Sequence, residues 1–327
     1  MACIHLISGR THMPIRRYDK SLLDQYFELH SQHALTFVRG FIIAMAEQPS
    51  PASVGTLYDQ FSDLCTDIFG GCIHFGYFDN PAESLAIGAA TDRLTSLVAE
   101  RLSLGPGQRI LDVGCGTGKP AAQIASAAGA RVLGISISNR QIELAQAQYG
   151  TTRQPGQVCF QFANAIDMPF ADGSFDGAYA IESLFHMDDK ATALAHIGRT
   201  LRPGGRLVIA DFFLDEPLAG SDADILTQFC QLCQAPPLCT AREYRDLLQQ
   251  AGFEVIEFTN IRNNVRRNYE VMAAALRQKA LLLDEASGEQ LRGGASIVEQ
   301  MVVTKTVGYV LMTATRMQHE EGKTMVH

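Results

Sequence analysis

The chain has 327 residues, of which 46% are hydrophobic and 19% charged, and its formal net charge at pH 7 is −8. This composition is typical of a globular protein and excludes a disordered or fibrous chain. The acidic balance argues against general binding to nucleic-acid phosphates, and no apolar run reaches the roughly 18 residues of a membrane-spanning helix.

Residues 1–44 are rich in His, Arg and aromatic side chains, and a polar stretch with Pro and Ser follows them. We therefore expect residues 1–50 to form an N-terminal helical extension and residues 51–327 to form the main domain. A natural translation start at Met13 or Met45 stays open as an alternative.

The first part of the main domain reads as two helices joined by an aromatic loop. Apolar residues spaced by three and four predict a helix over residues 52–69, which the pair Gly70-Gly71 ends. The loop 74–79 follows, and then a second helix over about 81–102.

From residue 109 the chain alternates between strands and helices. Short apolar runs predict strands over residues 109–113, 131–135, 158–162, 177–181 and 206–211. Helices are predicted between them, over about 120–128, 139–149 and 190–201. Continuous apolar strands separated by helices indicate a parallel sheet covered on both faces.

After residue 213 this rhythm changes. An irregular helical stretch over 216–239 precedes a helix at 240–251, where Thr240 and Glu243 have the spacing of a capping box. A strand over 253–259, mostly helix over 268–301 and a last strand over 308–316 follow. This ending predicts an antiparallel pair of strands at one edge of the sheet.

The most specific motif is the segment 110–118, which reads ILDVGCGTG. A strand ends at Asp112-Val113, and glycines then let the turn pass close under a ligand before a helix begins. The loop lacks the third glycine of the GxGxxG pattern, which counts against a dinucleotide-dependent oxidoreductase. The acidic Asp112 suits a ligand with a positively charged group.

With this loop and further motifs, the segment from about Tyr58 to Thr259 resembles the class I S-adenosylmethionine-dependent methyltransferases. It is most similar to the branch that modifies natural products, which includes rebeccamycin-type sugar O-methyltransferases and cyclopropane-synthase-like enzymes. The further motifs, in chain order, are Gly134–Ser138 with Gln141, Asp167–Phe170, Phe175-Asp176 and Leu201–Gly205. The resemblance implies a doubly wound, Rossmann-like, seven-stranded α/β sheet with helical lid segments at about 51–80, 214–245 and 262–303.

The resemblance also implies the cofactor, S-adenosylmethionine, and its ligands. The expected contacts from the loop and from the end of the fourth strand are Asp112, Gly114, Cys115, Gly116, Gly118 and Glu182. Ser136 replaces the acid that often holds the ribose, so this role passes to Ser136 and Gln141, unless Gln141 is only an exposed helix residue. Asn164, Ala165 and Ile166 are expected around the adenine, with the Asn164 side-chain oxygen accepting from its amino group.

His186 and Asp211 follow the fourth and fifth strands, whose carboxyl ends face the ligand in this fold. The resembled sugar O-methyltransferases place a His and an Asp at these positions. We therefore expect His186 to act as general base, with Asp211 fixing its tautomer. The alternative is a histidine at a helix start that bonds to local backbone.

The acceptor side is less defined. Tyr58, His74 and Tyr77 are lid candidates that could border the sulfonium by cation–π contact. Tyr58 is favoured, whereas core packing is an equal alternative for His74 and Tyr77. Glu182-Ser183 also resembles a pair in the substrate pocket of prenyl-diphosphate C-methyltransferases. Apolar residues in the later lid segments indicate a hydrophobic small-molecule acceptor, a plain core or a homodimer face. O-methylation in secondary metabolism is favoured, and the alternatives are C- or N-methylation of a prenyl, indole or polyketide substrate and a non-catalytic cofactor-binding subunit.

The cysteines and the overall composition add expectations about location and metals. The eight cysteines do not form the framework of a small secreted domain, so we expect reduced thiols in a cytoplasmic protein. Cys230 and Cys233 form a CxxC without a second paired motif, so no metal is expected. No nucleic acid or membrane is expected as a partner.

Overall fold

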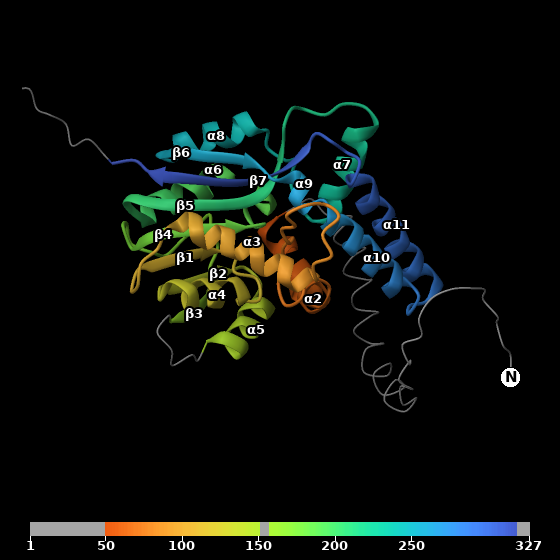
Figure 1. The fold of residues 1–327 in the computed structure, drawn as a ribbon, viewed down its shortest axis with the longest axis horizontal. Coiled ribbons are helices and arrows are strands. Elements are labelled where there is room, and N and C mark those ends of the chain that lie inside the picture. The colour runs from red at the N-terminus through yellow and green to blue at the C-terminus, as the bar shows by residue number, and fades with distance from the viewer. Residues whose placement is uncertain (1–49, 151–156, 319–327) are drawn as a thin grey trace, which may run out of the picture.

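The computed structural model describes residues 50–150 and 157–318. The expected N-terminal extension, apart from Ser50, therefore lies outside the described residues. Within them, seven strands form one sheet in the order β3-β2-β1-β4-β5-β7-β6 (Figure 1). Their bounds are β1 Arg109–Val113, β2 Arg131–Ser136, β3 Val158–Phe162, β4 Phe175–Ile181, β5 Leu201–Leu214, β6 Phe253–Asn260 and β7 Val307–Arg316.

The strand directions confirm the doubly wound arrangement. β1 pairs in parallel with β2 and β4, and the parallel pairing continues to β3 on one side and β5 on the other. β7 is inserted antiparallel between β5 and β6. The strand order reverses direction beside β1, so the glycine loop after β1 lies at the switch point where this fold binds ligands.

Helices cover both faces of the sheet, as expected for parallel strands with continuous apolar sequence. One face packs against α3, α4 and α5, and the other packs against α6 and α8. Their bounds are α3 Ile87–Leu102, α4 Lys119–Ala128, α5 Asn139–Tyr149, α6 Lys190–Thr200 and α8 Ala241–Gln250. The Thr240–Glu243 capping box at the start of α8 is present as predicted.

The structure corrects the helix predicted to begin near residue 81, which begins at Ile87. The preceding residues form a turn instead, in which the Asn80 side chain accepts from the Ala82 amide. Glu83 pairs with Arg93 on the following helix and so holds this turn against it. The predicted helical stretch 268–301 is divided into two helices, with a break at residues 281–284.

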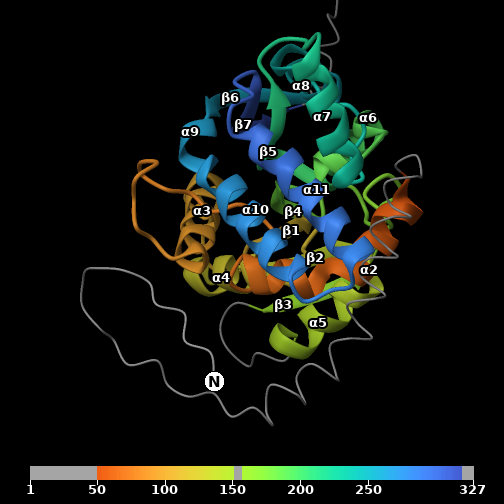
Figure 2. The same ribbon diagram turned by 90° about the vertical axis from the view of Figure 1, so that its right-hand side faces the viewer.

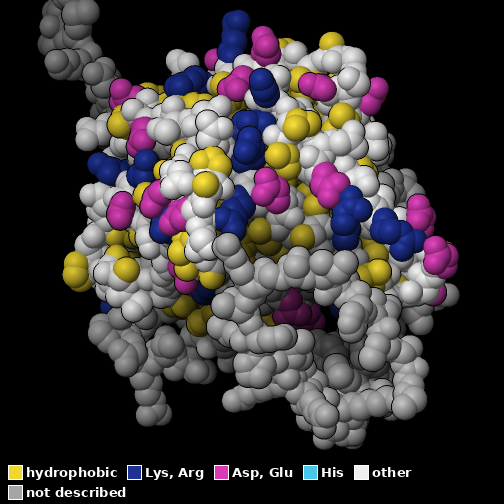
Figure 3. Space-filling view, turned by 45° about the vertical axis from the view of Figure 1, so that its right-hand side comes forward, with side chains coloured by type: hydrophobic (Ala, Val, Ile, Leu, Met, Phe, Trp, Pro, Cys, Tyr) yellow, Lys and Arg dark blue, Asp and Glu magenta, His cyan; other side chains and the backbone are white. Residues whose placement is uncertain are grey.

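The remaining helices gather at the carboxyl ends of the parallel strands, as Figures 1 and 2 show. They are α2 Pro51–Ile68, α7 Ser221–Leu232, α9 Arg262–Val265, α10 Arg267–Ala280 and α11 Glu285–Met301. They come from the three segments expected to form lids. On the described part of the face in Figure 3, acidic and basic side chains are interspersed rather than separated into patches.

α2 is docked on the loop before α5 by a small residue and a carboxylate. A side chain at Gly55 would place its Cβ 2.9 Å from the Ile137 carbonyl oxygen, so glycine allows the close crossing. The Asp59 carboxylate accepts from the Ser138 hydroxyl at 2.5 Å and from the Arg140 amide at 3.1 Å. These contacts bring α2 over the end of β2.

Candidate active site

The glycine loop after β1 has a backbone that only glycine adopts easily. Gly114, Gly116 and Gly118 have φ angles of 83°, 53° and 81°. A Cβ on Gly114 would overlap the Ser183 side chain, and one on Gly118 would lie 2.5 Å from the Phe160 ring. The loop therefore fits closely between its neighbours and leaves open space on its outer side.

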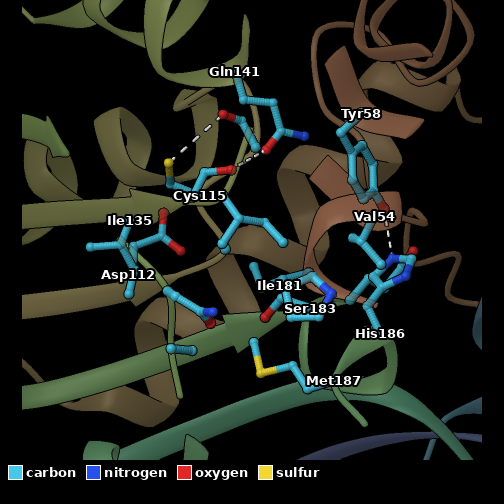
Figure 4. Close-up of a pocket in the computed structure, with 18 of the residues that line it drawn as sticks. Val54, Tyr58, Asp112, Cys115, Ile135, Gln141, Ile181, Ser183, His186 and Met187 are labelled. Atoms are coloured by element: carbon cyan, nitrogen blue, oxygen red, sulfur yellow. Dashed lines mark hydrogen bonds between the residues drawn. The ribbon is translucent and has the colours of Figure 1, made fainter. Parts of the chain in front are cut away.

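That space is a cavity of about 230 Å³ at the carboxyl ends of β1, β2 and β4. It is lined by fourteen predicted site residues, which are Tyr58, His74, Asp112, Gly114, Cys115, Gly116, Ser136, Gln141, Asn164, Ala165, Ile166, Glu182, Ser183 and His186. Figure 4 shows how the labelled ones among them face the same space. Gly118 does not line it and packs closely against Phe160 and Ala145 at the start of α4, and its contact with the cofactor stays a prediction.

Asp112 is the acidic group at the floor of this cavity, with 2% of its surface exposed. One carboxylate oxygen, Oδ2, has no hydrogen-bond partner among the described residues. Burial raises the pKa of Asp112 to about 7, while the adjacent Tyr179 hydroxyl and His74 partly oppose that rise. An unpartnered buried carboxylate fits a ligand that brings a positive charge.

The end of β2 and the loop after β3 carry the other polar groups of this cavity. The Ser136 hydroxyl donates to Gln141 Oε1 at 2.7 Å, and Gln141 is buried rather than exposed. Asn164 Oδ1 accepts from the Ile166 amide at 3.2 Å, so this oxygen is already engaged with local backbone. The pair Ser136–Gln141 leaves hydroxyl and amide groups suited to two ligand hydroxyls.

His186 lies in a short 3-10 helix, η1 Leu184–His186, directly after β4. Its Nδ1 faces the Gln234 carbonyl oxygen at 3.4 Å, and its Nε2 lies 2.7 Å from the Tyr58 hydroxyl (Figure 4). A carbonyl can only accept, so the proton lies on Nδ1 and Nε2 presents a lone pair. Burial lowers the pKa of His186 to about 4, which keeps the imidazole neutral at physiological pH.

The expected hydrogen bond between His186 and Asp211 is absent, which corrects that prediction. Asp211 Oδ2 instead accepts from the Phe185 amide at 2.9 Å and from the Tyr244 hydroxyl at 3.2 Å. Its side chain is fully buried and lines neither cavity described here. Asp211 therefore contacts the backbone of η1 rather than the His186 ring, and the group that His186 Nδ1 faces is a backbone carbonyl.

Glu182 directly follows β4 and has a φ of 47°, an uncommon backbone conformation for a residue with a side chain. Its Oε1 accepts from the Phe75 amide and from the Tyr309 hydroxyl, both at 2.7 Å. Burial raises the pKa of Glu182 to about 7, and His74 opposes the rise. Glu182 lines the first cavity and also a second one beside it.

The second cavity has a volume of about 140 Å³ and is almost wholly apolar. It shares Tyr58, Ile73, Glu182 and His186 with the first cavity. Its other lining residues come from all three lid segments and the sheet, namely Leu57, Cys65, Ile68, Phe69, Phe75, Phe185, Phe212, Phe229, Leu232, Cys233, Met272 and Leu276. The two cavities therefore meet at His186 and Glu182.

The lid candidates His74 and Tyr77 lie in different surroundings. His74 lines the first cavity only, and its ring nitrogens face the Phe75 carbonyl at 2.8 Å and the Thr95 hydroxyl at 3.4 Å. Tyr77 lines neither cavity and packs against the core, which agrees with the packing alternative for this residue.

Sequence reasoning missed Tyr179, Gln234 and Tyr309. Tyr179 could have been found from strand register, since it pairs with Asp112 across β1 and β4. Tyr309 and the Gln234 carbonyl carry no local signal, because they depend on β7 and on the turn after α7.

In the described parts of the chain, no group of His, Cys, Asp and Glu has the arrangement of a metal site. Cys233, from the CxxC motif, lines the second cavity instead. No helix among residues 50–150 and 157–318 is long and apolar enough to cross a membrane.

Comparison with known proteins identifies the fold and the family. Residues 111–209 match the family described as a methyltransferase domain. The chain is 50% identical to the O-methyltransferase resE of Aspergillus sclerotiorum, over 83% of this chain and 100% of that protein. It is 48% identical to the O-methyltransferase cnsE of Penicillium expansum, over 82% of this chain and 94% of that protein.

Among solved structures, the chain resembles the [4+2]-cyclase SpnF with a TM-score of 0.70 and 30% identity, over 83% of this chain and 97% of that one. These matches replace the alternative of a dinucleotide-dependent oxidoreductase. The cavity fits S-adenosylmethionine, because a buried carboxylate with one unpartnered oxygen and a tightly packed glycine loop face it. The chain belongs to the S-adenosylmethionine-dependent methyltransferases and is an enzyme that O-methylates a small molecule.

Proposed function

We propose that this enzyme methylates an acceptor hydroxyl at the junction of the two cavities and that His186 Nε2 removes the hydroxyl proton. The observation that carries the proposal is the orientation of His186. Its Nδ1 proton is directed to the Gln234 carbonyl, so the basic Nε2 faces the junction. His186 also lines both cavities, which is the position that a base shared by cofactor and acceptor needs.

The first cavity would hold the cofactor through this chain's own polar groups. The Asp112 carboxylate would pair with a positive charge, and Ser136 with Gln141 would bind the ribose hydroxyls. Ala165 and Ile166 would provide an apolar wall for the adenine. When bound, S-adenosylmethionine supplies an electrophilic methyl group on a sulfonium, which leaves orientation and proton removal to the protein.

The chemical step balances with a single protein base. The acceptor oxygen forms a bond to the methyl carbon while the sulfur–methyl bond breaks and its electron pair stays on sulfur. The hydroxyl proton moves to His186 Nε2, and the His186 ring becomes an imidazolium. The low pKa of buried His186 makes it a weak base in the empty site, so proton transfer would accompany methyl transfer rather than precede it.

Tyr58 would connect α2 to the proton-transfer step. Its hydroxyl lies 2.7 Å from Nε2, where the acceptor hydroxyl must approach. The acceptor therefore has to replace Tyr58 at Nε2 or bind beside it. Asp211 would be a positioning residue, because it holds the Phe185 amide in η1 and does not reach either cavity.

The test begins by finding an acceptor, through incubation of extracts with enzyme and isotope-labelled cofactor and mass spectrometry of the products. With that acceptor, His186→Ala should lower kcat by about 100-fold or more. The dissociation constant of S-adenosylhomocysteine should stay within about threefold, which shows an intact cofactor site. Near-normal turnover in His186→Ala would remove this histidine from the mechanism.

A further inference from the structure

We infer that the second cavity receives a ring-sized apolar end of an uncharged acceptor, and that Glu182 at its mouth discriminates against anionic acceptors. This inference rests on the proposed function, because it assumes that the acceptor hydroxyl lies near His186. It adds the chemical class of the acceptor, which neither the glycine loop nor His186 determines.

The size of the cavity sets what can enter it. Its volume of about 140 Å³ is close to that of a dry protein cavity of about 150 Å³ that binds benzene. The lining of this cavity is almost wholly apolar, so a hydrocarbon guest would displace water that makes few hydrogen bonds to the wall. A single aromatic ring or a short branched hydrocarbon fits, and the rest of a larger acceptor would have to lie outside.

The lining favours a flat, unsaturated group. Phe212 is central, since its ring makes edge contacts with Phe75, Phe185 and Phe229 at centroid distances of 5.4, 5.0 and 5.9 Å. Such edge-to-face clusters present both ring faces and ring edges to a guest. Met272 adds a flexible thioether on the α10 side, which adapts to the shape of the guest.

The charges around the cavity exclude an anion. Its described lining contains no Lys or Arg, and its polar side chains at the junction are Tyr58, Glu182 and His186. His186 is kept neutral by burial, so it offers no positive charge to a carboxylate or phosphate. His74 acts electrostatically on Glu182, but it lines only the first cavity.

Glu182 adds a selective element to this apolar site. Its Oε1 is held by Phe75 and Tyr309, whereas Oε2 has no hydrogen-bond partner among the described residues. In its ionised form, which predominates above its pKa of about 7, Glu182 accepts from a neutral hydroxyl and repels a carboxylate, which cannot donate to it. The same residue therefore orients an alcohol at the junction and rejects an acid.

The absence of tryptophan from the chain allows a direct binding test. Phe229→Trp places a single tryptophan in the cavity wall, and Leu232→Trp is a second reporter in case the first does not fold. Leu281→Trp is the matched control, because Leu281 is 81% exposed and lines neither cavity. Fluorescence quenching by para-nitrobenzyl alcohol and by para-nitrobenzoate is measured with saturating S-adenosylhomocysteine at about pH 8.5, where Glu182 with its pKa of about 7 is ionised.

With a cavity reporter, the alcohol should quench with saturation, and the carboxylate should need at least about a tenfold higher concentration. Glu182→Gln in the same reporter background should reduce that ratio below about threefold. The Leu281→Trp control should show no saturable quenching.

Equal binding of the two probes, no saturable binding of the alcohol, or an unchanged ratio in Glu182→Gln would each overturn the inference. Calorimetric titration with S-adenosylhomocysteine checks beforehand that each reporter is folded. The measurement involves no methyl transfer, so its failure is separate from a failure of His186 as base.

Discussion

Replacing Asp112 with Asn removes a negative charge from the cofactor cavity and leaves its shape almost unchanged. The carboxylate is buried, and its Oδ2 has no hydrogen-bond partner among the described residues. We therefore expect Asp112→Asn to weaken binding of S-adenosylmethionine and S-adenosylhomocysteine, since both carry an ammonium group. The loss concerns one charge-assisted interaction at the end of β1.

The magnitude follows from that single interaction. A hydrogen bond to a charged group contributes about 1.5–3 kcal/mol, which corresponds to roughly 10- to 150-fold in affinity. The pKa of about 7 also makes the binding pH-dependent. Protonated Asp112 carries no charge, so wild-type affinity should rise with pH and change by about tenfold between pH 6 and pH 8.

Calorimetric titration of S-adenosylhomocysteine at pH 6, 7 and 8 checks this prediction. Asp112→Asn should bind more weakly at pH 8 and should lose most of the pH dependence. Asp172→Asn is the control, because its side chain is 79% exposed and pairs with Arg199 on the surface. Wild-type affinity in Asp112→Asn, or a pH dependence that persists in it, would refute the assigned role.

Three further predictions concern the loop, η1 and α2. Gly118→Ala should lower the free energy of unfolding, measured by urea titration, by about 1–3 kcal/mol. The reason is that Gly118 has a φ of 81° and that a Cβ there would lie 2.5 Å from the Phe160 ring. Unchanged stability would contradict the packing argument. Asp211→Asn should leave a buried donor unpaired and lower the free energy of unfolding by about 1–3 kcal/mol. In this variant kcat should fall while the affinity for S-adenosylhomocysteine is retained. Weaker cofactor binding with a normal kcat would contradict a role of Asp211 through η1. Asp59→Ala removes the hydrogen bonds that this α2 carboxylate accepts from the Ser138 hydroxyl and the Arg140 amide, while Asp63 still pairs with Arg140. Stopped-flow measurements should therefore show faster release of S-adenosylhomocysteine, and an unchanged rate would separate α2 from cofactor retention.

Much of the sheet could be predicted from sequence because its strands are buried runs with clear boundaries. β1, β3 and α5 have the predicted bounds, and the capping box at Thr240 marks the start of α8. The helix expected from residue 81 begins later, because Glu83 pairs with Arg93 and stabilises a turn. That contact depends on tertiary structure and leaves no periodic signal in the sequence.

The candidate site likewise has a part that the sequence could predict and a part that depends on tertiary contacts. The glycine loop and Asp112 are contiguous in sequence, so their shared cavity could be predicted. The partner of His186 could not, because two strands that end side by side do not determine which side chains touch. Asp211 turns to the Phe185 amide, and the Gln234 carbonyl reaches His186 from a turn 48 residues later. Tyr309 reaches Glu182 from β7, which only the sheet order places nearby.

The most direct test of O-methylation uses cofactor whose methyl carbon is carbon-13, with an acceptor identified from extracts. The account predicts a product whose labelled carbon has the chemical shift of a methoxy group and one acceptor hydroxyl fewer than the substrate. A labelled methyl bound to carbon or nitrogen would contradict it, because neither product requires His186 Nε2 to remove a hydroxyl proton.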